Sequence, residues 1–313
     1  MKNSCLWAVI SLLALTACND EKEVRVEAGP AENYPAEIHG TIKEYSAIAD
    51  SKGISGSWAD GEAIGITTAA GLSDMPNVAT EDRNVKYVYS STENSFLVDS
   101  PEGEDYTIYF KGLYDMKLYA YAPYTGQRGT IPGPVEIATT SEMQVEDRQA
   151  GIDFLYAESA GSQKSPKVEF LFYHKMCNVR LNFRPKNDDV QLSALDYKLK
   201  AMKLDGVFNP STGQATLKEG AIPQDIEMHL AVSENMSSSL IFYPQTFSTS
   251  SVLEVVMGEK SYAVSPQTDI NMEAGQVYVF DVMIGEQEMT INLSSIADWE
   301  TGGEKYGIAG EGN

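Results

Sequence analysis

Short runs rich in β-branched and aromatic residues recur along this chain of 313 residues, each bounded by Gly, Pro, Asn, Asp or Ser. Several runs alternate apolar and polar residues, which is typical of strands with one buried face. Helical periodicity over eleven or more residues is nearly absent. The runs are Ile64–Thr68, Val85–Tyr89, Tyr106–Phe110, Leu118–Ala122, Lys167–Phe172, Asn178–Phe183, Ser239–Tyr243, Val252–Met257, Val277–Val282 and Met289–Leu293. This pattern predicts an all-β fold made of β-sandwiches.

The segment Gly161-Ser-Gln-Lys-Ser-Pro166 is the best candidate for a domain boundary, because it is polar and separates two strand-rich halves of similar length. We expect residues 34–163 to form an N-terminal β-sandwich and residues 164–313 a C-terminal one. The tail after Trp299 is rich in glycine and is expected to be loose. Ser193–Lys203 fits either a weak amphipathic turn or a strand, and we favour the strand.

The first residues, 1–17, have the pattern of a secretory signal, with Lys2 ahead of an apolar stretch too short to span a bilayer. They end in Leu15-Thr16-Ala17-Cys18, which is typical of a lipobox, where a peptidase cleaves before a lipid-modified cysteine. Lipid on Cys18 would anchor the mature chain in a membrane. The alternative is an ordinary secretory signal with an accidental cysteine.

Residues 18–33 are polar and acidic, and they read as a tether behind the lipidated cysteine. The run Asn19-Asp-Glu-Lys-Glu23 resembles the export signal of surface lipoproteins, and a solvated tether explains it equally well. No other stretch is long and apolar enough to span a bilayer, so the sequence predicts an ectodomain anchored only by lipid.

Charge and cysteine content exclude other classes of protein. The chain has 45 acidic and 23 basic residues, a formal charge of −22, and no Lys/Arg cluster, so nucleic-acid binding is not expected. Of three cysteines, Cys5 and Cys18 lie in the signal region. Cys177 remains, within an apolar alternation, and is interpreted as a core residue rather than a nucleophile. No disulfide framework is possible.

Motifs for catalysis or metal binding are missing. His39, His174 and His229 are far apart and have no metal-ligand spacing, and no nucleophile elbow, P-loop or dinucleotide fingerprint occurs. The acidic run Asp99–Asp105 could bind Ca²⁺, but a solvated hairpin loop is the simpler reading. A glycosidase carboxylate pair cannot be recognised from sequence. We therefore expect no enzyme activity and no cofactor.

Several segments together resemble the fimbrillin-like lipoproteins of Bacteroidota, the type V pilins. They are Trp58-Ala-Asp-Gly61-Glu-Ala-Ile-Gly65-Ile66, Leu118-Tyr-Ala-Tyr-Ala-Pro-Tyr124, Asp153-Phe-Leu-Tyr-Ala157, Val168-Glu-Phe-Leu-Phe-Tyr-His174, Leu204-Asp-Gly-Val-Phe-Asn-Pro-Ser-Thr-Gly213, Ala274-Gly-Gln-Val-Tyr278 and Ile296-Ala-Asp-Trp299. Glu62 replaces the Asp that is usual in the first segment. The resemblance implies two tandem transthyretin-like β-sandwich domains behind a lipoprotein signal.

The resemblance also implies a mechanism. Such subunits are exported as outer-membrane lipoproteins, and a trypsin-like protease removes the N-terminal segment with its first strand, here Ala36–Lys43. The vacated groove then accepts a strand from another pilus subunit by donor-strand exchange. The candidate processing sites are Lys43 and Lys52, because no Arg lies where the family often has one. The candidate donor strand carries Met289, Ile291, Leu293 and Ile296.

Two further readings stay open besides an enzyme such as a glycosidase, which rests on no motif. If the lipid and first strand are retained, the chain is an anchor or accessory subunit. It could instead be a surface glycan-binding lipoprotein, since its 17 tyrosines include possible sugar-stacking platforms, although most should fill cores. An adhesion target, in a host or a glycan, is also possible.

Five residues of the quoted segments have structural readings of their own. Trp58 and Trp299 are expected to seal sandwich ends. Gly61 and Gly65 suit a turn or a close approach of backbone and side chain. His174 is expected to be a hydrogen-bonded structural histidine rather than a catalytic or metal-binding one.

Overall fold

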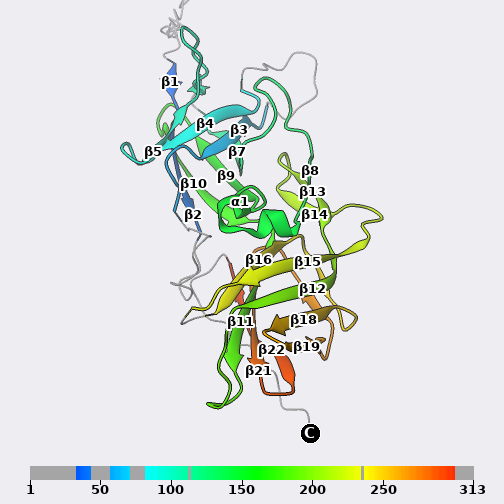
Figure 1. The fold of residues 1–313 in the computed structure, drawn as a ribbon. Helices are drawn as coiled ribbons and strands as arrows, with labels where there is room; N and C mark the ends of the chain where they lie inside the picture. Colours follow the sequence, from blue (N-terminus) through cyan, green and yellow to red (C-terminus); the bar gives the residue numbers. More distant parts are fainter. Residues whose placement is uncertain (1–32, 44–56, 71–81, 112–113, 234–235, 300–313) are drawn as a thin grey trace, which may run out of the picture. The chain divides into compact units, whose positions relative to one another are not determined.

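The computed structural model describes residues 33–43, 57–70, 82–111, 114–233 and 236–299. Residues 1–17, Cys18, Lys52 and the Gly-rich tail lie outside these ranges, as does the predicted tether except Asn33. None of the helices in the described part is long and apolar enough to cross a membrane. Strands dominate the described ranges, which confirms the all-β fold class (Figure 1).

The first sheet closes into a barrel. Its strand order is β10-β2-β5-β4-β3-β7-β9, and β9 pairs again with β10. The strands are β2 (Glu37–Ile42), β3 (Ala63–Thr68), β4 (Val85–Ser90), β5 (Ser95–Val98), β7 (Met116–Ala122), β9 (Leu155–Gly161) and β10 (Lys167–His174). A short β1 (Tyr34–Pro35) pairs with β6 (Tyr109–Phe110). This closed sheet differs from the two-sheet sandwich expected for residues 34–163.

Alternation along the strands builds the barrel core. In β10, buried Val168, Phe170 and Phe172 alternate with exposed residues. The strand predicted at Tyr106–Phe110 is shorter than expected, because side chains occupy its backbone donors. Thr107 N–H donates to Asp105 Oδ1 at 2.9 Å, and Ile108 N–H donates to Tyr87 Oη at 3.0 Å. Those donors are therefore not available to a neighbouring strand.

The second part is a sandwich of two four-stranded sheets, ordered β16-β11-β21-β22 and β15-β12-β18-β19. Its strands are β11 (Cys177–Pro185), β12 (Leu195–Lys203), β15 (Pro223–Leu230), β16 (Ser237–Phe242), β18 (Val252–Met257), β19 (Lys260–Val264), β21 (Gln276–Ile284) and β22 (Met289–Asp298). A pair of short strands, β17 (Gln245–Phe247) and β20 (Ile270–Met272), adds to it. Buried side chains from both sheets form one core.

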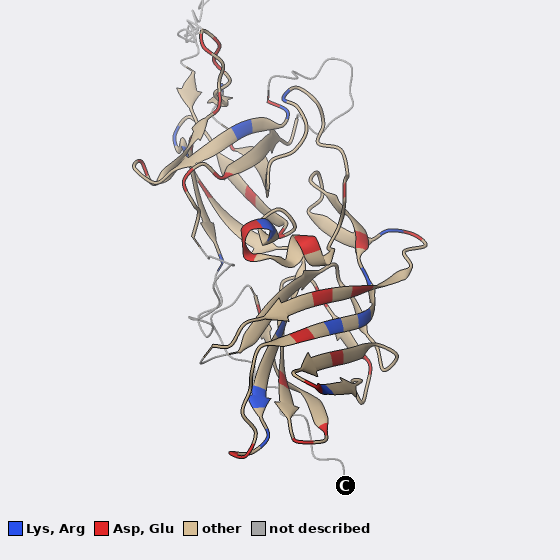
Figure 2. Cartoon of the chain, in the orientation of Figure 1, with Lys and Arg blue, Asp and Glu red and all other residues tan. Residues whose placement is uncertain are grey.

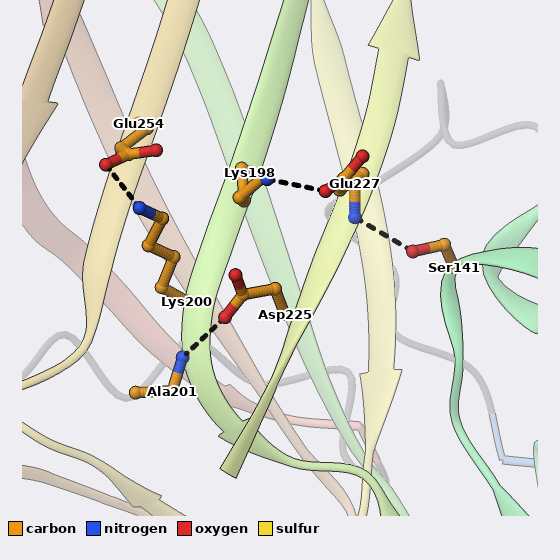
Figure 3. A network of polar contacts seen from close by, with 7 residues as sticks. All are labelled: Ser141, Lys198, Lys200, Ala201, Asp225, Glu227 and Glu254. Atoms are coloured by element: carbon orange, nitrogen blue, oxygen red, sulfur yellow. Dashed lines mark hydrogen bonds and ion pairs between the residues drawn. The ribbon is translucent and has the colours of Figure 1, made fainter.

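Strand β12 confirms the strand reading of Ser193–Lys203, and its outer face is polar. Lys198 pairs with Glu227 of β15 at 2.5 Å, and Lys200 with Glu254 of β18 at 2.6 Å (Figure 3). The lysines of β12 thus lie between acidic neighbours, while other acidic residues are spread over strands and turns (Figure 2). Such exposed pairs contribute at most about 1 kcal/mol each, so they favour solubility more than stability.

The segment before β9 joins the two parts. Strand β8 (Val135–Ala138) pairs with β13 (Asp205–Asn209), which also pairs with β14 (Gln214–Leu217). A 3-10 turn η1 (Ser141–Gln144) and a short helix α1 (Glu146–Gln149) follow β8. The buried Gln144 side chain binds both the N–H and the C=O of Ile241, each at 2.8 Å. It thereby covers the edge of β16, which would otherwise be an open strand edge.

A third apolar cluster lies where these elements meet, and includes Tyr121, Phe154, Phe208, Tyr243 and Trp299. The boundary predicted at 163/164 falls between β9 and β10, which are neighbouring strands of the barrel. The chain passes from barrel to sandwich at residues 175–176, between β10 and β11.

Candidate functional site

Strand β2 is held in the barrel by strands distant in the sequence. It runs parallel to β10, with Glu37 to Ile42 opposite Lys167 to Phe172. On its other side it pairs with β5 through Ile38 and Phe96, in antiparallel direction. Backbone bonds close both ends, from Glu37 N–H to Pro166 O and from Lys43 N–H to Phe172 O, each 3.0 Å. Removing β2 would open a groove between β5 and β10.

The inward face of β2 supplies part of the barrel core. Ala36, Ile38 and Ile42 are buried, and the residues between them point outward or are partly exposed. Burying one isoleucine side chain stabilises a fold by about 1.5–3 kcal/mol. The strand is therefore attached by apolar burial as well as by its backbone hydrogen bonds.

Gly40 lies on the same inward face, next to the rings of Phe96 and Phe172. Trp58 packs edge-on against Phe96 and against Phe172, with ring centroids 5.0 Å apart in both pairs. A Cβ atom on Gly40 would lie 3.0 Å from Cε2 of Phe96 and of Phe172. We call Trp58, Phe96 and Phe172 the aromatic trio. The rings of Phe96 and Phe172 occupy the space that a side chain at position 40 would need.

A cavity of about 310 Å³ lies at the end of β2, lined by Ile42, Trp58, Glu62 and Asp153 among others. The indole Nε1 of Trp58 is buried and has no hydrogen-bond partner among the described residues. The Glu62 carboxylate accepts a bond from Ala59 N–H at 2.8 Å. The vacated groove would thus open into a cavity with apolar walls and two carboxylates.

Glu62 makes stability depend on pH. Burial raises the pKa of the Glu62 carboxyl above its ordinary value. The hydrogen bond from Ala59 N–H lowers this pKa, and the nearby charge of Asp153 raises it, so the net shift is upward. The folded chain therefore favours the protonated carboxyl. The stability that this carboxyl contributes is fully present below the pKa of Glu62 in the unfolded chain, and it is lost as pH rises through the higher pKa in the folded chain.

We expect Glu62→Gln to match the wild type at pH 4 and to unfold at a higher temperature at pH 7. The gain should stay within about 1 kcal/mol, because Glu62 is partly solvated. Thermal unfolding at both pH values measures it, and a variant less stable at pH 7 would contradict it.

The two predicted motif glycines have different roles. Gly61 has φ of +89°, and no atom lies within 4 Å of the position a Cβ would take. It serves the turn before β3. Gly65 lies within β3, and a Cβ there would come 2.4 Å from Tyr121 Cε1 and 2.6 Å from Asn84 Oδ1. Tyr121 Oη donates to Asn84 Oδ1 at 2.8 Å, so Gly65 makes room for a buried hydrogen bond.

We expect Gly65→Ala to destabilise the protein by about 2–3 kcal/mol or more, because the methyl group overlaps a ring and a buried amide that cannot both move. Gly61→Ala is the matched control. It should cost only about 1–2 kcal/mol, the price of a left-handed backbone for alanine. Chemical denaturation of both variants gives the comparison. Equal losses would show that Gly65 is not closely packed.

His174 and Trp299 meet where the sandwich joins the barrel. His174 ends β10 and is buried, and its Nδ1 donates to Asp153 Oδ1 at 2.8 Å. The Trp299 ring stacks on the imidazole, with centroids 3.9 Å apart and planes within 7°. Trp299 follows β22 and donates its N–H to Gly275 O. These contacts fit the structural reading of both residues.

The predicted donor residues lie on β22, an edge strand paired with β21. Met289 and Ile291 are buried in the sandwich core, Leu293 packs against it, and Ile296 is 39% exposed. A register shift opposite Val279 and Phe280 interrupts the alternation between Leu293 and Ser295. In this structure β22 therefore completes its own sandwich.

The predicted processing site Lys43 and the histidines have contacts of their own. Lys43 directly follows β2, and its Nζ lies 5.6 Å from the Tyr173 ring centroid. His39 Nδ1 lies near Asn94 O at 3.3 Å, and His229 Nδ1 near Asp196 Oδ1 at 2.7 Å, so the three histidines have separate partners. Within the described ranges, no group of three or more His, Cys, Asp or Glu side chains is placed to hold a metal ion.

Cys177 and seven of the described tyrosines lie in cores. Burial raises the pKa of the Cys177 thiol to about 12, and Sγ donates to Phe242 O at 3.3 Å. Seven tyrosines are buried: Tyr87, Tyr121, Tyr156, Tyr197, Tyr243, Tyr262 and Tyr278. Tyr106 is partly exposed, but the Arg128 guanidinium covers its ring at 3.7 Å. These rings are not free platforms for a sugar.

Sequence reasoning missed Gly40, Gln144 and the cavity at the end of β2. The signal for Gly40 is a glycine at an inward position between two isoleucines, which is unusual in a strand core. Gln144 carries no such signal, because a polar residue in a turn region looks exposed until its strand partner is known.

These features define an all-β protein in which a β-barrel, completed by a strand from the start of the described chain, is joined to a β-sandwich. Residues 49–299 match the model of the fimbrillin-like family, and the chain belongs to that family.

Solved structures support the assignment. A proposed cell adhesion protein from Bacteroides ovatus is 31% identical, with a TM-score of 0.76, over 86% of this chain and 98% of its own. A second proposed cell adhesion protein, from Bacteroides uniformis, shares the fold at 20% identity and a TM-score of 0.62, over 85% of this chain and 98% of its own. Among curated proteins, the search finds no match.

Proposed function

We propose that this protein is an adhesion subunit of a cell-surface pilus, stalk or accessory, which assembles by strand exchange at the β2 groove. Family membership and the proposed adhesion role of the similar Bacteroides ovatus protein support a surface adhesion role. The observation that carries the strand-exchange step is the placement of β2. An N-terminal strand fills a slot between β5 and β10, which come from later parts of the chain.

We infer the following steps. The chain is exported as an outer-membrane lipoprotein through Cys18, and cleavage at Lys43 or Lys52 separates β2 from β3. A strand from another subunit then enters the groove, where it pairs with β10 and β5 and fills the positions of Ile38 and Ile42. Main-chain hydrogen bonds supply affinity, and the inward pockets supply selectivity.

N-terminal sequencing of surface-purified protein, together with electron microscopy of the producing cells, tests the proposal. Fibres built from chains that begin after Lys43 or Lys52 are the expected result. If every chain still begins at lipidated Cys18 and no fibre contains the protein, the stalk role fails. Fibres whose base alone contains lipidated chains would instead assign the anchor role.

A further inference from the structure

We propose that the outer face of the barrel around Tyr173 binds a uronic acid residue of a short glycan, with Lys43 and Lys175 holding its carboxylate. This inference rests on the surface adhesion role proposed above and names the class of ligand for it. It does not depend on strand exchange. The observation that carries it is a pair of lysines, distant in the sequence, that meet at one tyrosine ring.

The barrel strands bring both lysines to this ring. Lys43 follows β2 and Lys175 follows β10, and the two strands run side by side in parallel. The Nζ atoms of Lys43 and Lys175 lie 5.6 and 5.7 Å from the centre of the Tyr173 ring. Lys175 Nζ also lies 5.7 Å from the ring of Tyr156, the buried neighbour of Tyr173 on β9. The fold therefore places two ammonium groups beside one partly exposed ring.

Within the described ranges neither of these lysines forms an ion pair, and the carboxylates of the adjacent strands already have partners. Glu158 of β9 pairs with Lys117 at 2.6 Å, and Glu169 of β10 pairs with Lys167 at 2.5 Å. Two like charges beside one ring repel each other, and the ring attracts each of them only weakly. An acid group bound between the two ammonium groups would remove this repulsion.

The surface next to the lysines suits a sugar ring. Leu171, two residues before Tyr173 on the outward face of β10, is 38% exposed. Thr41 lies opposite Leu171 in the register of β2 and β10 and is also exposed. One face of a sugar ring consists of C–H groups, which can pack on the tyrosine and the leucine, while the hydroxyls at its rim reach Thr41 and water. A uronic acid carries its carboxylate directly on such a ring, where two flexible lysines can close on it.

The charge of the whole chain limits the ligand to a short glycan. At physiological ionic strength charges are screened over about 8 Å, so a carboxylate at Tyr173 responds to the two lysines more than to distant acidic residues. A long polyanion would also meet the rest of a surface whose formal charge is −22 and would be repelled. Removal of β2 would take Lys43 away, so the site is complete only in chains that keep their first strand.

The test uses the full, uncleaved chain and a hyaluronan tetrasaccharide, in which every second residue is glucuronic acid. Isothermal titration calorimetry should show saturable binding with a Kd on the order of 0.1 mM. The carboxyl-reduced form of the same tetrasaccharide has the same rings without the charge, and should bind about tenfold or more weakly. A hexa-aspartate peptide offers carboxylates without a sugar ring, and should be weaker by a similar factor.

Variants of the protein locate the site. Lys43→Ala and Lys175→Ala should each weaken binding of the tetrasaccharide by about five- to tenfold. Tyr173→Ala should weaken it by about tenfold or more, whereas Tyr173→Phe keeps the ring and should stay within about twofold of the wild type. Lys260→Ala, which removes an exposed lysine on β19 of the sandwich, is the matched control and should also stay within about twofold. The lysine variants leave both cores intact, so they decide the question even if Tyr173→Ala folds poorly.

Each outcome bears on one level of the inference. If the tetrasaccharide does not bind, or binds equally well to the wild type and both lysine variants, the site is wrong. Equal binding of the carboxyl-reduced form would show that the carboxylate is not recognised, and equal binding of hexa-aspartate that the sugar is not. The pilus role is read separately, from fibres on producing cells. Fibres that contain a chain unable to bind the sugar would refute this site alone, and sugar binding by a chain absent from fibres would refute the pilus role alone.

Discussion

Replacing Trp299 by alanine is expected to lower the free energy of unfolding by about 3–5 kcal/mol. The ring is 4% exposed and belongs to the apolar cluster between the barrel and the sandwich. It also stacks on His174, which ends β10 of the barrel. The substitution therefore removes a large buried ring and leaves a cavity against a buried histidine. Urea unfolding followed by far-ultraviolet circular dichroism measures the loss.

Two controls make this result specific. Tyr114→Ala removes an aromatic side chain that is 91% exposed, and should change stability by no more than about 0.5 kcal/mol. Trp299→Phe keeps a ring over His174 and should recover a large part of the loss. A Trp299→Ala chain as stable as the wild type would mean that the junction between barrel and sandwich does not depend on this ring.

Strand-like residue patterns were sufficient to predict about half of the described strands, because a strand with one buried face has a period of two. Lys167–His174 and Cys177–Pro185 are examples. The pattern identifies the faces of a strand but not its neighbours. That β2 lies beside β10 depends on residues about 130 positions apart in the sequence. Closure of the barrel therefore could not be predicted from local patterns.

At the candidate site, too, the sequence predicted some features and could not predict others. Its glycines and tryptophan were recognisable as a motif, yet the sequence does not distinguish a turn at Gly61 from a close contact at Gly65. The distinction rests on Tyr121 and Asn84, which reach Gly65 from other parts of the chain. Gln144 is similar, because its role is to bind the backbone of Ile241, 97 residues away.

Removing residues 1–43 is expected to unfold the barrel while the sandwich stays folded. The truncation takes Ile38 and Ile42 out of the barrel core, and loss of two buried isoleucines costs roughly 4–10 kcal/mol by comparison with isoleucine-to-alanine substitutions. That is comparable to the whole stability of a typical domain. The sandwich core shares no residue with the barrel core, so it should keep its own transition.

A peptide of residues 33–43 added in trans should restore the barrel, since it returns both isoleucines and the hydrogen bonds to β10. The truncated chain contains only Trp58 and Trp299. With Trp299→Phe, fluorescence reports Trp58 alone, which lies in the aromatic trio beside β2. A blue shift of the Trp58 fluorescence on adding the peptide is expected.

An Ile38→Asp peptide should fail to restore the barrel, whereas a Glu37→Ala peptide, altered at an exposed position, should act like the native peptide. A truncated chain whose barrel unfolds cooperatively at the wild-type temperature without any peptide would contradict the dependence on β2, because the groove would then hold its shape with no strand in it.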